Sequence, residues 1–351
     1  MKRFQDLLGV LDKDKPVIIQ AHDYPDHDAI ASGFSLLHLL RKFGFSCEFC
    51  YGGEMQGFSV AGVARELLIP VVPASSLNIP EQAQIILVDG IAGNMNVTNL
   101  LNRPLTGIID HHQPPACVPE CPFVDIRPSF GSCSTIIYQY YLETMTEPPR
   151  DVATALLTGI MMDTAQMTRG VDAADLAAFS GLFFKSDWEE SAYILRNSFS
   201  VQDIPVLRYA FDHYYTQGQV CFVELESARV GAAGGGSDDG AIGAGVKSPI
   251  RPELLGLISD YFLRMTEIHF VVTVETGSEV CRLSLRSENP RLPADLVIKR
   301  ALQGIGSGGG HSHMSGGTMP AGLNPGSGEL RKKFLDVIDG FLKQQYNKEE
   351  L

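Results

Sequence analysis

The first half of the chain alternates short apolar runs with longer segments of helical periodicity. Pro16–Ala21, Gln84–Val88 and Leu105–Ile109 are short apolar runs of the kind that form buried strands. A helical pattern from about Asp28 to Phe43 follows the first of them. Strands that alternate with helices predict a parallel sheet with crossover helices. We therefore predict an α/β fold with helices on both faces of a parallel sheet.

Helical patterns dominate the middle of the chain, and the pattern changes again near Gly218. The predicted helices of the middle region are Ser132–Leu142, Asp151–Met162, Asp172–Phe184 and Val201–Tyr215. Beyond it we predict a strand at Gln219–Glu226, a hairpin of Ile268–Glu275 with Val280–Arg286, and helices at Ala294–Leu302 and Glu329–Gln345. This part is typical of a smaller α/β domain.

The length of the chain also predicts more than one domain. Its 351 residues exceed what one hydrophobic core usually serves. Together with the change near Gly218, the length predicts a first domain at 1–195, a helical connector at 196–217 and a second domain at 218–351.

The charge balance limits the class of partner. The chain has 28 basic and 41 acidic residues and a net charge of −13. Binding to long nucleic acid depends largely on Lys and Arg that neutralise phosphates, so long nucleic acid is not expected as a partner. A small phosphate ester in a metal-lined site remains compatible with this charge.

The N-terminal segment and the cysteines favour a cytoplasmic protein without membrane contact. Residues 1–15 lack an apolar targeting segment, and the longest apolar stretches are too short to span a bilayer. Seven cysteines fit reduced thiols better than a disulfide framework. A zinc site built from the pairs Cys47/Cys50 and Cys117/Cys121 is an alternative, but we expect buried or incidental thiols.

Acidic residues and histidines follow the apolar runs at several places. They are His22, Asp26 and Asp28 after the first run, Asp89 after the second, Asp110, His111 and His112 after the third, and Asp163 after Leu156–Met162. Taken alone, Asp26 or Asp28 would be assigned as a helix cap. Repetition at several strand ends favours a common site, because ligands of open α/β sheets collect beyond the carboxyl ends of the strands.

Such a concentration of carboxylates needs compensating charge. Like charges packed closely raise one another's pKa and destabilise a fold unless cations are present. Oxygen-rich sites with some imidazole suit a hard to borderline divalent ion such as Mn²⁺ or Mg²⁺. The pattern therefore predicts a metal centre.

These motifs resemble those of the DHH phosphoesterases, in particular the DHH–DHHA1 type of bacterial nanoRNases and cyclic di-AMP phosphodiesterases. The segment His22–Ser32 is similar to the family motif His-x-Asn-Pro-Asp-Gly-Asp-Ala-x-Gly-Ser, and Asp110-His111-His112 to the Asp-His-His that names the family. Gly308-Gly309-Gly310-His311 is similar to its Gly-Gly-Gly-His motif. Several motifs in this order are specific, whereas one tripeptide is not.

The resemblance implies a centre of two Mn²⁺ ions, for which Mg²⁺ or Co²⁺ could substitute. The implied ligands are His22 and Asp26 for the first ion, Asp28, His111 and Asp163 for the second, and Asp89 as the bridge. Asp110 would orient a neighbouring imidazole, and His112 would contact the scissile phosphate.

The resemblance assigns substrate recognition to the second domain. The implied residues are Arg286, Ser287, Gly309, Gly310 and His311. Arginine suits phosphate because its planar fork pairs with two oxygens, although a salt-bridged surface arginine is the alternative.

The chain departs from the family pattern near the implied metal ligands. Tyr24 stands where the family has Asn, and His27 where it has Gly. The segment Asp163–Arg169 differs from the usual Asp-Thr-Gly-x-Phe-Arg. We expect His27 to face solvent at the start of a helix, with an extra phosphate contact as the alternative.

The function implied by the resemblance is hydrolysis of short linear oligoribonucleotides, such as pGpG or pApA, to mononucleotides. The alternative is a phosphodiesterase for cyclic di-AMP or cyclic di-GMP, and a 3′-phosphoadenosine 5′-phosphate phosphatase activity could accompany either. A dinucleotide receptor on a retired catalytic fold is the non-enzymatic alternative. The resemblance also suggests a homodimer.

Overall fold

The computed structural model describes residues 3–55, 58–91, 97, 103–114, 120–196, 199–227 and 250–349. The chain divides into two compact units, Met1–Ser198 and Phe199–Leu351. Each unit has its own sheet and its own apolar clusters, as two separately packed cores require.

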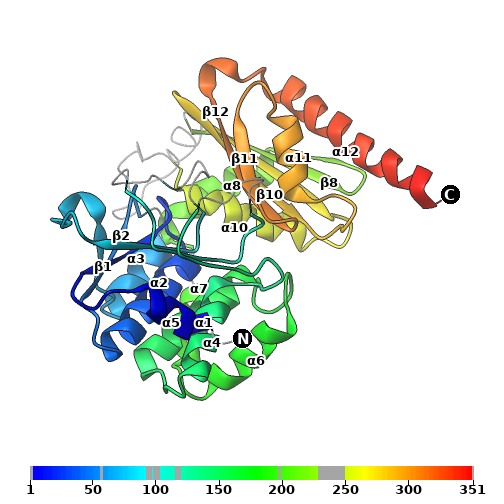
Figure 1. The fold of residues 1–351 in the computed structure, drawn as a ribbon. Helices are drawn as coiled ribbons and strands as arrows, with labels where there is room; N and C mark the ends of the chain where they lie inside the picture. Colours follow the sequence, from blue (N-terminus) through cyan, green and yellow to red (C-terminus); the bar gives the residue numbers. More distant parts are fainter. Residues whose placement is uncertain are drawn as a thin grey trace, which may run out of the picture. The chain divides into compact units, whose positions relative to one another are not determined.

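The first unit contains the predicted parallel sheet (Figure 1). Its strands are β1 (Val17–Ala21), β2 (Cys47–Tyr51), β3 (Val71–Pro73), β4 (Gln84–Val88), β5 (Gly107–Asp110) and β6 (Phe123–Ile126). All neighbouring pairs are parallel, in the order β3-β2-β1-β4-β5-β6. The order reverses between β1 and β4, which is where open α/β sheets bind their ligands.

The helices of the first unit all contribute to one large apolar cluster. They are α1 (Arg3–Val10), α2 (His27–Lys42), α3 (Phe58–Glu66), α4 (Cys133–Glu143), α5 (Arg150–Asp163), α6 (Ala173–Phe183) and α7 (Trp188–Arg196). The opposite face of the sheet has a smaller cluster of Ile18, Cys50, Ala74 and Ile85. Within the described residues this face carries the short 3₁₀ helix η1 (Ala74–Ser76).

The second unit is a smaller α/β domain with a mixed six-stranded sheet. Its elements are η2 (Val201–Asp203), α8 (Ile204–Asp212), β7 (Tyr214–Gln217), β8 (Val220–Glu226), α10 (Pro252–Leu263), β9 (Phe270–Thr276), β10 (Val280–Ser287), α11 (Ala294–Ala301), β11 (Ser307–Gly310), β12 (Met314–Pro320), η3 (Ala321–Leu323) and α12 (Ser327–Glu349). The strand order is β11-β12-β10-β9-β8-β7, and only β8 and β9 pair in parallel. α11 and α12 pack on one face, and α8 and α10 on the other.

The second sheet confirms the predicted hairpin and corrects one helix. β9 and β10 pair antiparallel around Gly277, as their alternating pattern predicts. The predicted helix Val201–Tyr215 is too long, because α8 ends at Asp212 and Tyr214–Gln217 forms the edge strand β7 beside β8. Pairing with β8 therefore overrides the local helical pattern.

Cys47 and Cys50 lie on opposite faces of the first sheet. Cys47 belongs to the large apolar cluster and Cys50 to the small one, because successive strand residues alternate. Burial raises the pKa of each thiol to about 12. These two thiols therefore cannot bind one ion together, and Cys117 of the second pair lies outside the described residues.

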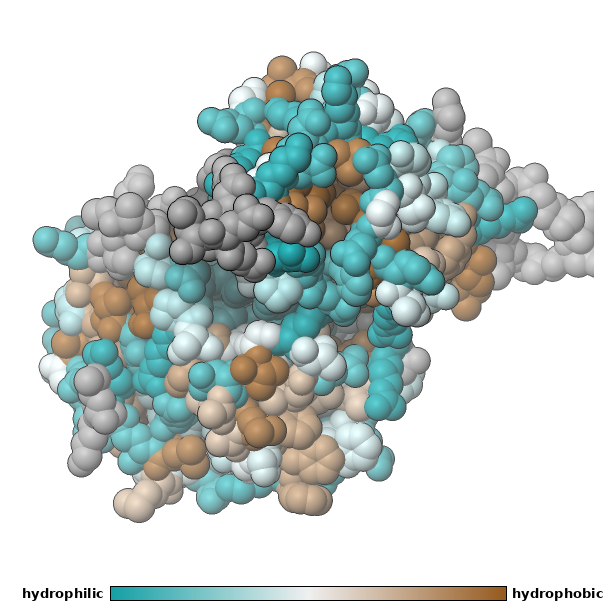
Figure 2. Space-filling model, turned by 90° about the vertical axis from the view of Figure 1, so that its right-hand side faces the viewer, coloured by the Kyte–Doolittle hydropathy of each residue, from teal (hydrophilic) through white to brown (hydrophobic). Residues whose placement is uncertain are grey.

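The surface in Figure 2 mixes hydrophilic residues with separate hydrophobic patches. Phe184 and Met145, each 92% exposed, are among the exposed apolar side chains. Within the described residues, the helices are too short or too polar to cross a membrane.

Gly33 allows α2 to lie directly against β2. A Cβ at Gly33 would be 2.2 Å from Cζ of Phe49. We predict that Gly33→Ala lowers the free energy of unfolding by about 1–3 kcal/mol through overpacking. Urea unfolding followed by circular dichroism measures this change.

Gly62 in α3 provides the matched control, because a Cβ there would meet no atom within 4 Å. Gly62→Ala should raise stability by about 0.5–1 kcal/mol through helix propensity. Equal effects of the two substitutions would contradict the close packing at Gly33.

Candidate metal centre

The turn after β1 and the first turn of α2 place His22, Asp26 and Asp28 at the carboxyl end of β1. Asp26 is the N-cap of α2, and its Oδ1 atom accepts hydrogen bonds from the amides of Asp28 and Ala29, both at 3.0 Å. The capping interpretation therefore holds for Asp26. It does not exclude metal binding, because a carboxylate has a second oxygen.

Asp28 is fully buried and is held by the start of α4. Its Oδ2 accepts a hydrogen bond from the amide of Cys133 at 2.6 Å, and its Oδ1 from the amide of Ser134 at 2.9 Å. The positive end of the α4 dipole therefore faces this carboxylate and favours its charged form.

Asp89 follows β4 with a backbone φ of 56°. Asp is one of the few residues that adopt this left-handed region without a large penalty. Its amide donates to the carbonyl of Ile109 at 2.9 Å, which fixes the turn against β5. The carboxylate is buried and lies between two imidazoles: Oδ2 is 3.8 Å from Nε2 of His22, and Oδ1 is 3.5 Å from Nε2 of His111.

The segment Asp110–His112 at the end of β5 orients two imidazoles differently. Nδ1 of His111 lies 3.2 Å from the carbonyl oxygen of Phe130, so its Nε2 faces Asp163 at 3.1 Å and Asp28 at 3.9 Å. Nδ1 of His112 lies 2.7 Å from Oδ1 of Asp110, which also accepts the amides of His111 and His112. His111 is buried, whereas 30% of the His112 side chain is exposed. The neighbouring imidazole that Asp110 orients is therefore His112.

Asp163 is the last residue of α5, and an unusual turn follows it. Ala165, Gln166 and Met167 all have positive φ, between 47° and 63°. Residues other than glycine enter this region at a cost, so the segment that departs from the family pattern is strained. The hydroxyl of Thr164 accepts a hydrogen bond from the amide of Met167, which stabilises the turn.

The six predicted ligand residues lie in two groups. The possible ligand atoms of His22, Asp26 and Asp89 lie within 4.8 Å of one another, as do those of Asp28, His111 and Asp163. The distance of 3.5 Å between Asp89 and His111 links the groups. The structure thus brings together the residues that the resemblance assigns to two ions, and their assignment to ions stays a prediction.

Burial and mutual repulsion shift the pKa values of these residues. Burial, with Asp89 and Asp163 nearby, raises the pKa of Asp28 well above its usual range. Burial and the charge of Asp26 raise the pKa of Asp163 to about 6. Burial would lower the pKa of His111, but the neighbouring carboxylates of Asp163 and Asp89 outweigh this and raise it. Without a cation, the group retains protons that a divalent ion would replace.

The donor set also fits a divalent cation. Among the described residues, His22 Nδ1, Asp89 Oδ1 and Asp110 Oδ2 are buried atoms without a hydrogen-bond partner. Buried polar atoms of this kind are costly unless a further group satisfies them. Carboxylates with imidazoles suit Mn²⁺ better than a soft ion.

The structure corrects the prediction for His27. Its side chain is only 3% exposed, and among the described residues neither ring nitrogen has a hydrogen-bond partner. Burial lowers its pKa to about 4. Its position at the start of a helix suggested that the side chain is exposed to solvent. However, α2 begins inside the unit, and 13 of its residues are buried. Tyr24, the other departure in this motif, is 51% exposed.

In the second unit, Arg286 packs against α10. Its Nε donates to Oδ1 of Asp260 at 3.0 Å and its Nη1 to Oγ of Ser284 at 3.1 Å. A Cβ at Gly256 would be 2.8 Å from Nη2, so the guanidinium lies close to the backbone of α10 at this glycine. Arg286 therefore makes the ion pair that the alternative interpretation predicts, with 15% of its side chain exposed.

The three glycines of the run Gly308–Gly310 differ in their surroundings and backbone conformation. A Cβ at Gly308 would be 2.8 Å from Ile298, and Gly310 has a φ of 136° at the turn into β12. Around Gly309 the nearest atom to a Cβ would be 3.9 Å away. Of the three, Gly309 leaves room for a close approach of another molecule.

Ser287 and His311 both lie at strand ends. Ser287 is buried, and its hydroxyl bonds to Asn289. The ring of His311 stacks on His313 with 5.5 Å between centroids, a neighbour that the motif comparison does not single out.

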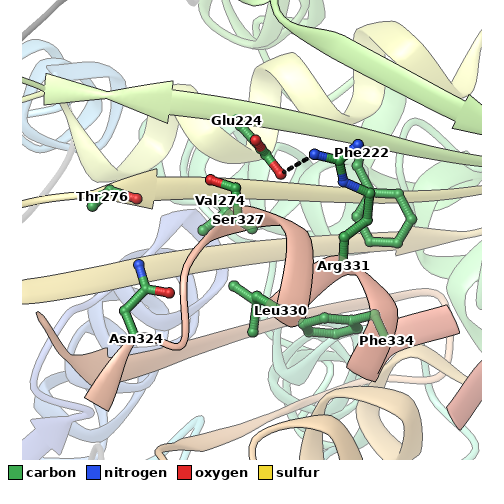
Figure 3. A pocket seen from close by; sticks show the side chains of 9 residues that line it. All are labelled: Phe222, Glu224, Val274, Thr276, Asn324, Ser327, Leu330, Arg331 and Phe334. Atoms are coloured by element: carbon green, nitrogen blue, oxygen red, sulfur yellow. Dashed lines mark hydrogen bonds and ion pairs between the residues drawn. The ribbon is translucent and has the colours of Figure 1, made fainter. Parts of the chain in front are cut away.

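A small pocket of the second unit lies apart from these residues (Figure 3). Its cavity volume of about 10 Å³ is room for roughly one water molecule. Arg331 donates to Glu224 at 3.1 Å on its wall, and none of the predicted site residues lines it.

Two known domain families match the chain. Residues 16–160 match the DHH family, N-terminal domain, and residues 238–344 match the DHHA1 domain. The two matches occur in the order in which the motifs occur.

Two relatives have sequences similar to this chain. An uncharacterized protein of Methanocaldococcus jannaschii is 25% identical over 339 residues, 93% of this chain and 65% of that protein. A probable manganese-dependent inorganic pyrophosphatase of Streptococcus thermophilus is 28% identical over 158 residues, 42% of this chain and 48% of that protein. The chain thus spans less than two thirds of either relative.

The crystal structure of an exopolyphosphatase-related protein from Bacteroides fragilis has the same fold. The TM-score is 0.73 at 19% identity, over 96% of this chain and 95% of that one. The chain belongs to the DHH–DHHA1 phosphoesterase family.

Proposed function

We propose that the protein is a Mn²⁺-dependent phosphodiesterase that hydrolyses short linear oligoribonucleotides, such as pGpG or pApA, to mononucleotides. The observation that carries the proposal is the pair of ligand groups joined at Asp89. Two-ion sites of this composition are common in enzymes that cleave phosphate esters.

The first ion would be held by His22, Asp26 and Asp89, and the second by Asp28, His111 and Asp163, with Asp89 shared. When bound, the ions would lower the pKa of water and neutralise charge that develops on the phosphate. The similarity to a probable manganese-dependent inorganic pyrophosphatase supports Mn²⁺ as the metal.

His112 is suited to contact the scissile phosphate. Burial would lower its pKa, but the hydrogen bond to Asp110 outweighs this and raises the pKa to about 9. Without bound metal, the imidazole is therefore protonated at neutral pH, and its second nitrogen can then donate to a phosphate oxygen. Asp110 holds the ring in place, as carboxylates beside catalytic imidazoles do.

The second unit would recognise the rest of the substrate. Arg286, Ser287, Gly309, Gly310 and His311 are the proposed contacts. Asp260 and Ser284 fix one edge of the Arg286 guanidinium, which reduces the entropy that phosphate binding must overcome. The open side of Gly309 supports a backbone contact there.

Substrate length is the most direct test of this function. In Mn²⁺, the enzyme should cleave linear dinucleotides at least about tenfold faster than 10-mers, since its net charge of −13 disfavours long nucleic acid. Product formation by chromatography from a panel of pGpG, pApA, cyclic di-AMP, cyclic di-GMP and a 10-mer measures this. Equal rates across lengths would contradict the proposal, and faster turnover of the cyclic substrates would favour the cyclic alternative.

A histidine pair provides the control for that panel. His111→Ala should lower turnover by about 100-fold or more. Even the loss of a residue that only orients a metal ligand typically lowers metal affinity or activity by about 10–100-fold. His38→Ala removes an imidazole that instead bonds to Tyr141 at 2.9 Å and should leave turnover nearly unchanged. Similar losses in both variants would count against the assigned centre.

Mn²⁺ affinity should rise with pH between 5 and 8. The pKa of Asp163 is raised to about 6, and those of Asp28 and His111 are also raised. These groups hold protons at low pH, and Mn²⁺ must displace them, so binding weakens as pH falls. Calorimetric titration in two buffers of different ionisation enthalpy counts the released protons. An affinity independent of pH would contradict these shifts.

Arg286→Gln should raise KM for a dinucleotide by about tenfold or more, because a hydrogen bond to a charged group contributes about 1.5–3 kcal/mol. Lys332→Gln, an equal loss of charge at an exposed position of α12, is the control. Steady-state kinetics compares the two variants. An unchanged KM for Arg286→Gln would leave Arg286 as a structural ion pair with Asp260.

A further inference from the structure

Asp175 on α6 is a fully buried carboxylate outside the proposed metal ligands. Its Oδ1 accepts a hydrogen bond from the hydroxyl of Thr135 at 2.5 Å, and its Oδ2 accepts the amides of Gly131 at 2.7 Å and Asp172 at 2.8 Å. The bond to Asp172 belongs to the capping box of α6. The other two bonds reach 40 and 44 residues back along the chain, so capping alone does not account for them.

These two long-range bonds fix the turn that starts α4. Ser132 is the N-cap of α4, and its hydroxyl accepts the amide of Thr135 at 3.1 Å. Cys133 and Ser134 are the first two residues of α4, and their amides donate to the two oxygens of Asp28. Asp175 is thus linked to Asp28 through one rigid turn of helix.

The same turn also contacts the neighbourhood of Asp163. A Cβ at Gly131 would be 2.7 Å from Cγ2 of Thr164, 2.7 Å from the carbonyl oxygen of Gly170 and 2.9 Å from Oδ2 of Asp175. Thr164 directly follows Asp163 and begins the left-handed turn. The contacts of Gly131 therefore place the α4 turn against the backbone next to a second proposed ligand.

We propose that Asp175 is a positioning residue for the Asp28–His111–Asp163 group. Through Thr135 and Gly131 it sets the start of α4, whose amides aim the carboxylate of Asp28. Outer partners that orient metal ligands are typically worth 10–100-fold in metal affinity. This inference rests on the proposed metal centre, but it concerns only one of the two ligand groups.

The test is Mn²⁺ binding, measured by calorimetry and by electron paramagnetic resonance of free Mn²⁺ without any substrate. Asp175→Asn should weaken one class of Mn²⁺ site by about 10–100-fold and leave the other class unchanged. Thr135→Val, which keeps the shape and removes the hydroxyl, should have the same effect. Thr135→Ser, which retains the hydroxyl, should restore wild-type binding.

Asp172→Ala is the structural control. The Asp172 side chain caps α6 through the amide of Ala174, and within the described part of the chain it makes no hydrogen bond to the α4 turn. This variant should lower the melting temperature while both classes of Mn²⁺ site keep their affinity. If Asp175→Asn fails to fold, the Thr135→Val and Thr135→Ser pair decides in its place.

The outcomes separate this inference from the proposed function. Wild-type affinity in folded Asp175→Asn and Thr135→Val would overturn the positioning role alone. Equal weakening of both classes of site would also overturn it, since that result indicates general loosening. A wild-type protein that binds no Mn²⁺ would overturn the metal centre and this inference together.

Discussion

Four carboxylates are buried together at one edge of the first sheet, and the organisation of the first unit depends on how their charge is compensated. Asp28, Asp89, Asp110 and Asp163 are each at most 4% exposed. Removing an ion from water costs several kcal/mol even after relaxation, and repulsion between like charges adds to that cost. The N-terminus of helix α4 and the neighbouring imidazoles offset part of this cost in the protein without bound metal. A pair of divalent cations would offset much more, and this need is the physical basis of the proposed function.

The sequence was sufficient to predict the fold class and to predict that the candidate metal-ligating residues lie close together. The apolar runs that became β1, β4 and β5 are followed by His22, Asp89 and Asp110, and parallel strands bring such ends to one edge. The reversal of strand order between β1 and β4 then places His22 beside Asp89. Local pattern predicted these features because each strand is buried on both faces and its end is polar.

Long-range contacts were not predictable in the same way. His27 follows a helix cap and looked exposed, but α2 starts inside the unit and buries it. Asp175 was not among the predicted site residues, since its bonds to Thr135 and Gly131 depend on how α4 and α6 pack. Tyr214–Gln217 continued a helical pattern and instead pairs with β8. In each case the deciding partner is distant in the sequence, so no local pattern indicates it.

The central claim is that one edge of this sheet holds two cooperating ions, and anomalous diffraction at the manganese edge from crystals grown in Mn²⁺ tests it most directly. We predict two anomalous peaks about 3.5–4 Å apart. One should contact His22 and Asp26, the other His111 and Asp163, and both should contact Asp89. The absence of a peak among these residues, or a single peak that Asp89 does not contact, would contradict the account.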